Sequence, residues 1–130
     1  MKPAYIDTSF LIGLKFQKPA LTAARMVSRY ELFSSELLIA ELLAFGKRES
    51  IAGDLLWKAC RGLSWIVPAS SIASEIDRVS HAGYARGADL WHLACACYLS
   101  PDPGDLVFLT LDERQRTLAA RLGFQAPRLA

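Results

Sequence analysis

Four acidic residues lie within or at the ends of the most apolar segments of the chain. They are, in chain order, Asp7, Glu41, Asp89 and Asp112. A carboxylate held against apolar surface is unfavourable unless it is paired, protonated or bound to a cation. A fold that brings the four together would create an oxygen-rich pocket for a hard divalent cation such as Mg²⁺. The pattern therefore indicates metal-dependent chemistry on a phosphate ester.

Short apolar segments alternate with helix-like segments along the chain. Strands are expected at 3–7, 32–34, 63–67, 106–109 and, as a last short one, 124–126. Helices are expected from 10, at 21–30, from 35, at 51–61, 71–81, 89–99 and 113–122. This alternation predicts a single α/β domain over 1–130, with a central parallel sheet of four to five short strands and helices on both faces. Two of the acids, Asp7 and Asp112, follow strands, and such sheets bind ligands beyond the carboxyl ends of their strands.

Glu41 carries the strongest local signal of the four. On a helix its neighbours at i−4, i−3 and i+4 are Leu37, Leu38 and Phe45, so it shares the apolar face. A carboxylate there needs a partner, either an arginine or a metal. We therefore expect Glu41 to belong to a site.

The aspartates have a competing interpretation as helix caps. Asp112 opens a capping-box pattern that Gln115 completes, and Asp89 lies near the start of a buried-looking helix. For these two the local sequence leaves both interpretations open, and capping does not exclude a site role. Thr8 or Ser9 could cap the helix expected from residue 10, so Asp7 is not needed for capping and a site role is favoured.

Composition places weak limits on function. The 130 residues are 52% hydrophobic and carry a net charge of +2, from 15 basic and 13 acidic residues. Ten of the cations are arginines, which suit bidentate phosphate contacts. No segment approaches the roughly 20 apolar residues of a membrane span, and the N-terminus lacks a signal-peptide core, so we expect a cytoplasmic protein. Three cysteines, Cys60, Cys95 and Cys97, are expected to be reduced core thiols.

Four short motifs resemble those of the PIN-domain family. They are YIDTSFL at 5–11, SSELLIAELL at 34–43, ADLWHLA at 88–94 and LTLDERQ at 109–115. Their acidic residues follow one another at separations of 34, 48 and 23 residues, and the match covers essentially the whole chain. A chain of little more than the PIN domain is similar to the VapC toxins of toxin–antitoxin pairs.

The resemblance implies an endoribonuclease that uses one or two Mg²⁺ or Mn²⁺ ions to cut structured RNA. It implies that the catalytic and metal-binding quartet is Asp7, Glu41, Asp89 and Asp112, supported by Ser9 and Thr110. It also implies a homodimer and a cognate antitoxin protein that covers the active site.

Basic residues that could contact the RNA backbone are Arg48, Lys47 and Arg86. His92, which follows Asp89 by three residues, could alter metal or RNA contacts if it faced the pocket. We expect it instead to be satisfied at the helix surface.

Two alternatives remain. One is a metal-dependent phosphohydrolase acting on a small phosphate ester, which the same four acids could serve. The other is a non-catalytic PIN-like module that binds RNA or protein, against which the intact quartet argues.

Overall fold

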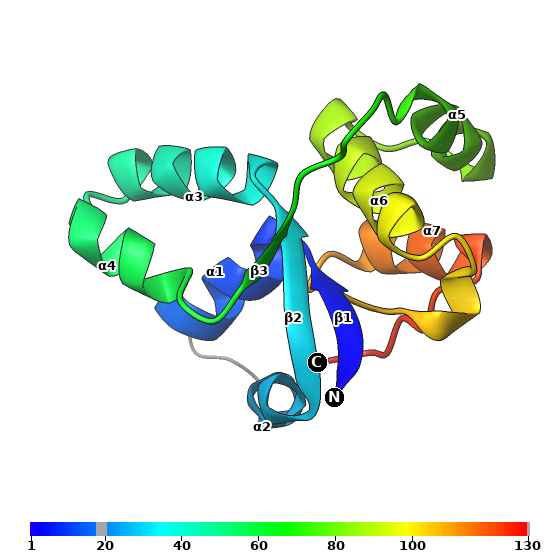
Figure 1. Cartoon of the computed structure of the whole chain (residues 1–130). Coiled ribbons are helices and arrows are strands. Elements are labelled where there is room, and N and C mark those ends of the chain that lie inside the picture. Colours follow the sequence, from blue (N-terminus) through cyan, green and yellow to red (C-terminus); the bar gives the residue numbers. More distant parts are fainter. Residues whose placement is uncertain (18–20, 130) are drawn as a thin grey trace.

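The structure is a computed structural model and describes residues 1–17 and 21–129. Its centre is a four-stranded sheet, in which every pairing is parallel and the strand order is β3-β2-β1-β4 (Figure 1). The strands are β1 (Lys2–Ile6), β2 (Tyr30–Ser35), β3 (Ser64–Ile66) and β4 (Val107–Leu109). The expected α/β fold with a parallel sheet is confirmed. The last short strand is reduced to one bridge, between Val107 and Gln125.

Seven α-helices occur in the described part of the chain. They are α1 (Thr8–Phe16), α2 (Leu21–Met26), α3 (Leu37–Arg48), α4 (Gly53–Ala59), α5 (Ala73–Ala82), α6 (Gly87–Leu99) and α7 (Glu113–Leu122). Short 3₁₀ helices follow at Val27–Arg29 and Pro103–Asp105. The helix expected at 21–30 is therefore α-helical only to Met26 and tightens before β2.

The helices cover both faces of the sheet, as expected. Because successive strand residues point to opposite faces, Tyr5 and Phe108 enter one core while Ala4 and Ile6 enter the other. The first core lies under α5, α6 and α7, and the second lies against α1, α3 and α4 (Figure 1). Tyr5 and Phe108 stack with ring centroids 5.3 Å apart, which fixes the centre of the first core.

Several helix starts differ from the sequence-based expectation, since α4, α5 and α6 begin two residues from the positions expected for them. Two further differences lie close to the carboxyl edge of the sheet. The cap of α1 is Asp7 and not Thr8 or Ser9, because its carboxylate accepts the backbone N–H of Phe10 at 3.1 Å. The helix expected from residue 35 begins at Leu37, since Ser34 and Ser35 still belong to β2. Ser34 donates its hydroxyl to the Ile6 carbonyl at 2.8 Å and so ties β2 to β1.

The carboxyl ends of β1 and β4 meet at one edge of the sheet. Ile6 pairs with Leu109, and the Asp7 amide donates to the Leu109 carbonyl at 3.3 Å. The residues that follow these strands, Asp7 and Thr110, therefore lie side by side. Among the described helices, none combines the length and the apolar character that crossing a bilayer requires. The three cysteines are buried and unoxidised, as expected.

Candidate functional site

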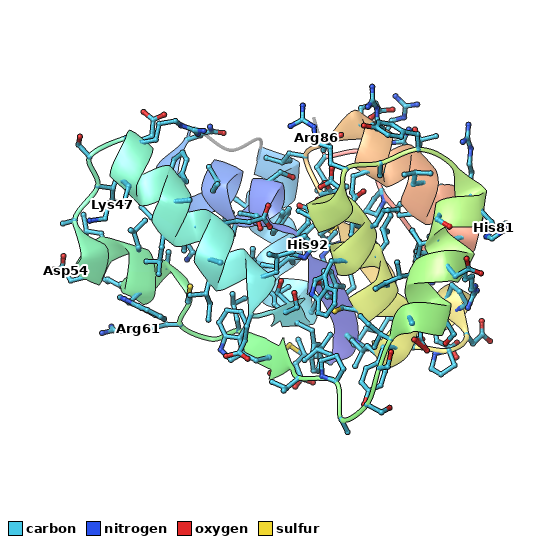
Figure 2. All side chains as sticks on the ribbon, turned by 90° about the horizontal axis from the view of Figure 1, so that it is seen from above. Lys47, Asp54, Arg61, His81, Arg86 and His92 are labelled. Atoms are coloured by element: carbon cyan, nitrogen blue, oxygen red, sulfur yellow. The ribbon has the colours of Figure 1, made fainter. Side chains whose placement is uncertain are left out.

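All four acids predicted from the sequence line one cavity of about 430 Å³ at the carboxyl edge of the sheet. They reach it from four different places in the chain: the end of β1, the middle of α3, the first turn of α6 and the start of α7. The other residues that line it are Thr8, Ser9, Ile12, Ala44, Phe45, Arg48 and His92. Seen from above the sheet, α3 and α6 flank this region, and His92 lies between them (Figure 2).

Asp7 is the most enclosed of the acids, with an exposed fraction of 3%. Its Oδ1 accepts the Ser9 hydroxyl at 2.7 Å and the Phe10 amide, and its Oδ2 accepts the Thr110 hydroxyl at 2.5 Å. Burial raises the pKa of Asp7, and the bonds from Thr110 and Ser9 oppose that rise. The protein thus surrounds this carboxylate with hydrogen-bond donors.

Ser9 and Thr110 also hold the loop between β4 and α7. Each hydroxyl donates to Asp7 and accepts a backbone amide, Leu111 N–H for Ser9 and Asp112 N–H for Thr110, both at 3.1 Å. The two residues therefore couple the position of Asp7 to the loop that ends at Asp112. This is the supporting place that the resemblance implies for them.

Glu41 is half-buried, and its Oε1 accepts two hydrogen bonds. The donors are the Thr8 hydroxyl and Nε2 of His92, each at 2.7 Å. Burial alone would raise the pKa of Glu41, but the bonds from His92 and Thr8 outweigh it and lower that pKa. Glu41 is therefore a carboxylate held at one oxygen, and the protein partners of that oxygen are Thr8 and His92.

His92 is buried at the centre of this arrangement, with 1% exposed, so the expectation of a surface histidine is wrong. Its Nδ1 lies 2.6 Å from the Tyr5 hydroxyl. An ionised Glu41 can only accept, so Nε2 carries a proton. Burial raises the pKa of Tyr5, which keeps the phenol protonated and able to donate to Nδ1. A hydrogen-bond chain thus runs from the core through Tyr5 and His92 to Glu41.

Asp89 lies in the first turn of α6, but it is not the cap, a position that Arg86 occupies. Burial raises the pKa of Asp89, and the neighbouring charges of Asp112 and Glu41 raise it further. Arg86 and His92 oppose this shift more weakly. Asp89 is therefore a carboxylate whose ionised form is disfavoured by its own surroundings.

Asp112 caps α7, as its sequence pattern allowed. Its Oδ1 accepts the amides of Arg114 at 2.9 Å and Gln115 at 3.2 Å. The capping box is not completed, because the buried Gln115 side chain donates instead to the Asp89 carbonyl at 3.0 Å. Gln115 thereby joins the start of α7 to the start of α6 and fixes the distance between two acids.

The predicted basic residues differ in how near they are to the cavity. Arg48 lines it and packs over the Phe45 ring at 5.6 Å, and Arg86 is close enough to act on the charge of Asp89. Lys47 lies on the outer side of α3, away from His92 (Figure 2). Arg48 and Arg86 are thus the better placed of the three for a phosphate.

The donor set fits a hard divalent cation but does not enclose one. Four carboxylates face one cavity, and the pKa of Asp89 is raised first by burial and then by the charge of Asp112, which a cation would offset. Within residues 1–17 and 21–129, however, no three His, Cys, Asp or Glu side chains are grouped closely enough to hold an ion. Hydrogen bonds engage both oxygens of Asp7 and one each of Glu41 and Asp112.

The sequence indicated the four acids, and the resemblance added Ser9 and Thr110, but the other groups that hold the acids were missed. Tyr5, Thr8 and Gln115 carry no local signal, because each is an ordinary residue of a strand or helix start. His92 did have a signal, its place on the same helix as Asp89, one turn later. No protein-family model and no curated protein matches the chain.

Proposed function

We propose that the chain is a metal-dependent endoribonuclease of the PIN-domain kind, acting as the toxin of a toxin–antitoxin pair. The observation that carries the proposal is the meeting of Asp7, Glu41, Asp89 and Asp112 in one cavity at the carboxyl edge of a parallel sheet. The four motif segments and the α/β fold support it. A homodimer and a covering antitoxin belong to the same proposal.

In this proposal the four carboxylates hold one or two Mg²⁺ or Mn²⁺ ions. Such an ion, when bound, supplies activation of water and neutralisation of charge on phosphoryl oxygens. The chain's own residues orient the ligands: Ser9 and Thr110 fix Asp7, and Thr8 and His92 fix one oxygen of Glu41 and leave the other for the cavity. Arg48 and Arg86 bind the phosphates of the RNA on either side of the cavity.

The raised pKa of Asp89 is consistent with a role as a metal ligand in such a site. Burial and the charges of Asp112 and Glu41 disfavour its ionised form, so a cation in the cavity would stabilise it. Without a ligand, the ionised form of Asp89 is unfavourable in the folded protein. A bound metal ion would compensate its negative charge. Asp89 is therefore the residue whose removal separates catalysis from folding most cleanly.

The test is cleavage of RNA by the purified protein with Mg²⁺ or Mn²⁺. Asp89→Asn and Glu41→Gln are each expected to reduce cleavage by about 100-fold or more, the scale on which loss of a transition-state contact acts. The matched control is Arg61→Gln, since Arg61 lies at the far end of the molecule near α4 (Figure 2). Its activity is expected to equal that of the unaltered protein.

Two outcomes would contradict the proposal. If the unaltered protein and both site variants cleave RNA equally with every metal ion, the nuclease proposal is contradicted. Release of phosphate from a small ester without RNA cleavage would favour the phosphohydrolase. For the toxin, expression in a bacterial host is expected to arrest growth, and expression of Asp89→Asn is not.

A further inference from the structure

A second concavity, of about 370 Å³, lies beside the acidic cavity. Tyr84, Arg114, Thr117, Leu118 and Arg121 line it. It is formed by the loop that joins α5 to α6 and by the outer face of α7. The two cavities share the first turn of α7, because the Arg114 amide donates to Asp112.

Tyr84 stands out because its aromatic ring is 76% exposed. One side of the ring is near Arg114, whose Cζ lies 5.9 Å from the ring centroid. An aromatic ring in contact with a guanidinium and otherwise open to solvent is a stacking surface with one face available. Nothing in the packing of the fold requires this side chain, because it contributes to neither core.

The loop that carries Tyr84 is fastened to α7. Arg121 donates from Nη1 to the Ala82 carbonyl at 3.2 Å. Gly83 allows the close approach, since a Cβ there would lie 2.8 Å from Cδ2 of Leu118. The ring is therefore presented on a held backbone, and Arg121 is positioned beside it.

Two arginines, Arg114 and Arg121, line this concavity together with Tyr84. Among the residues that the structure describes, no carboxylate lies within ion-pair distance of either guanidinium group. The nearby Glu113 is engaged by Arg116 and by Arg128. Two guanidinium groups beside an exposed aromatic ring complement the phosphates and bases of a nucleic-acid strand.

We propose that Tyr84, Arg114 and Arg121 form a subsite for one nucleotide of single-stranded RNA, next to the cleavage site. The base stacks on the open face of Tyr84, and the two guanidinium groups contact the phosphates that flank it. This inference rests on the proposed function for the identity of the ligand. It adds that the strand leaves the acidic cavity over the first turn of α7, so that RNA with an unpaired segment there is the favoured substrate.

The experiment measures RNA binding without cleavage. A short single-stranded RNA with 2-aminopurine at successive positions is titrated with the protein in EDTA, and both affinity and fluorescence quenching are recorded. Tyr84→Ala is expected to weaken binding about tenfold and to abolish quenching, as loss of one stacked base does. Tyr84→Phe is expected to retain both, because the ring remains.

Two further variants sharpen the result. Arg121→Gln is expected to weaken binding and to reduce its dependence on salt, because a phosphate contact is lost. Trp57→Ala removes another exposed aromatic residue, 53% exposed on α4, and is expected to bind as the unaltered protein does. Tyr84 is on the surface, so its variants are expected to unfold at the same temperature as the parent.

The subsite is overturned if Tyr84→Ala binds the RNA as tightly as the parent, or if Tyr84→Phe loses as much as the alanine variant. Absence of RNA binding by the parent also overturns it, and the exposed ring then belongs to a protein interface. Failure of the proposed nuclease has a different signature. In that case Tyr84-dependent binding persists in EDTA, while no metal ion supports cleavage.

Discussion

The acidic cavity has two walls that treat their carboxylates in opposite ways. On the inner wall, Asp7 and Glu41 accept hydrogen bonds from side chains of the protein. On the outer wall, Asp89 and Asp112 lie at the starts of two helices, and burial and each other's charge disfavour the ionised Asp89. Side-chain donors hold the carboxylates of the inner wall, whereas on the outer wall Asp112 accepts backbone amides as a helix cap. Under the proposed function, a cation would bind mainly at the outer wall.

The largest effect is expected when a metal ion is added to the folded protein. At a concentration about 100 times its dissociation constant, Mg²⁺ is expected to stabilise the folded protein by about 2.7 kcal/mol. Thermal unfolding with and without the ion measures this, and Asp89→Asn is expected to lose most of the gain. Asp54→Asn is the control, because Asp54 lies on α4, far from His92 (Figure 2). An equal gain in parent and Asp89→Asn would show that the outer wall does not bind the ion.

Removing a carboxylate from the inner wall is expected to lower the free energy of unfolding. In EDTA, Asp7→Ala leaves the Ser9 and Thr110 hydroxyls and the Phe10 amide without their acceptor, at a cost of about 2 kcal/mol. Part of this loss in stability is offset, because the variant no longer buries a charged carboxylate. Asp112→Ala removes only a helix cap and is expected to cost about 1 kcal/mol. Urea unfolding compares the two, and a greater loss for Asp112→Ala would reverse the comparison.

The sequence was sufficient for the sheet and for the four acids that line the cavity. Segments of three to five residues, separated by helical patterns, predicted all four strands, although the segment at 32–34 covers only the middle of β2. Asp112 was predicted both as a cap and as a site residue, and it occupies both positions. These features depend on neighbours in the chain, and local patterns therefore reveal them.

The contacts that hold the acids of the inner wall could not be derived in the same way. Asp7, Thr8 and Ser9 are three adjacent residues that can each cap a helix, and only the contact with Thr110, 103 positions later, decides between their roles. His92 was expected at the surface because a helix ordinarily has a solvated face. In α6, however, every residue from His92 to Cys97 is buried, so no such face exists there. Long-range contacts fix these side chains, and one sequence does not record them.

His92 provides a smaller test of the inner wall. His92→Leu removes the donor to Glu41 and leaves the Tyr5 hydroxyl unpaired, which is expected to cost about 1 to 2 kcal/mol. His92→Gln keeps an amide donor that can reach Glu41, and it is expected to recover part of the stability. Mn²⁺ binding by calorimetry is the second measurement. It is expected to weaken about tenfold or more in the leucine variant and less in the glutamine variant, as for other residues that orient metal ligands. Unchanged stability and unchanged Mn²⁺ binding in His92→Leu would show that the inner wall does not depend on the hydrogen bonds from Tyr5 through His92 to Glu41.

The smallest expected effect is a pH dependence that belongs to the outer wall. The pKa of Asp89 is raised in the folded protein, so its protonated form is favoured by folding. Its contribution to stability is therefore fully present below the pKa of the unfolded chain and is lost as pH rises through the pKa of the folded protein.

In EDTA, Asp89→Asn and the parent are expected to be equally stable in acid. The variant is expected to become the more stable by less than about 1 kcal/mol near neutral pH, because Asp89 is partly solvated and its repulsions are screened. Urea unfolding at several pH values measures this difference, and the raised pKa of Asp7 cancels because both proteins contain it. A variant less stable than the parent at neutral pH would mean that Asp89 is already satisfied by the protein, and the two walls would then be alike.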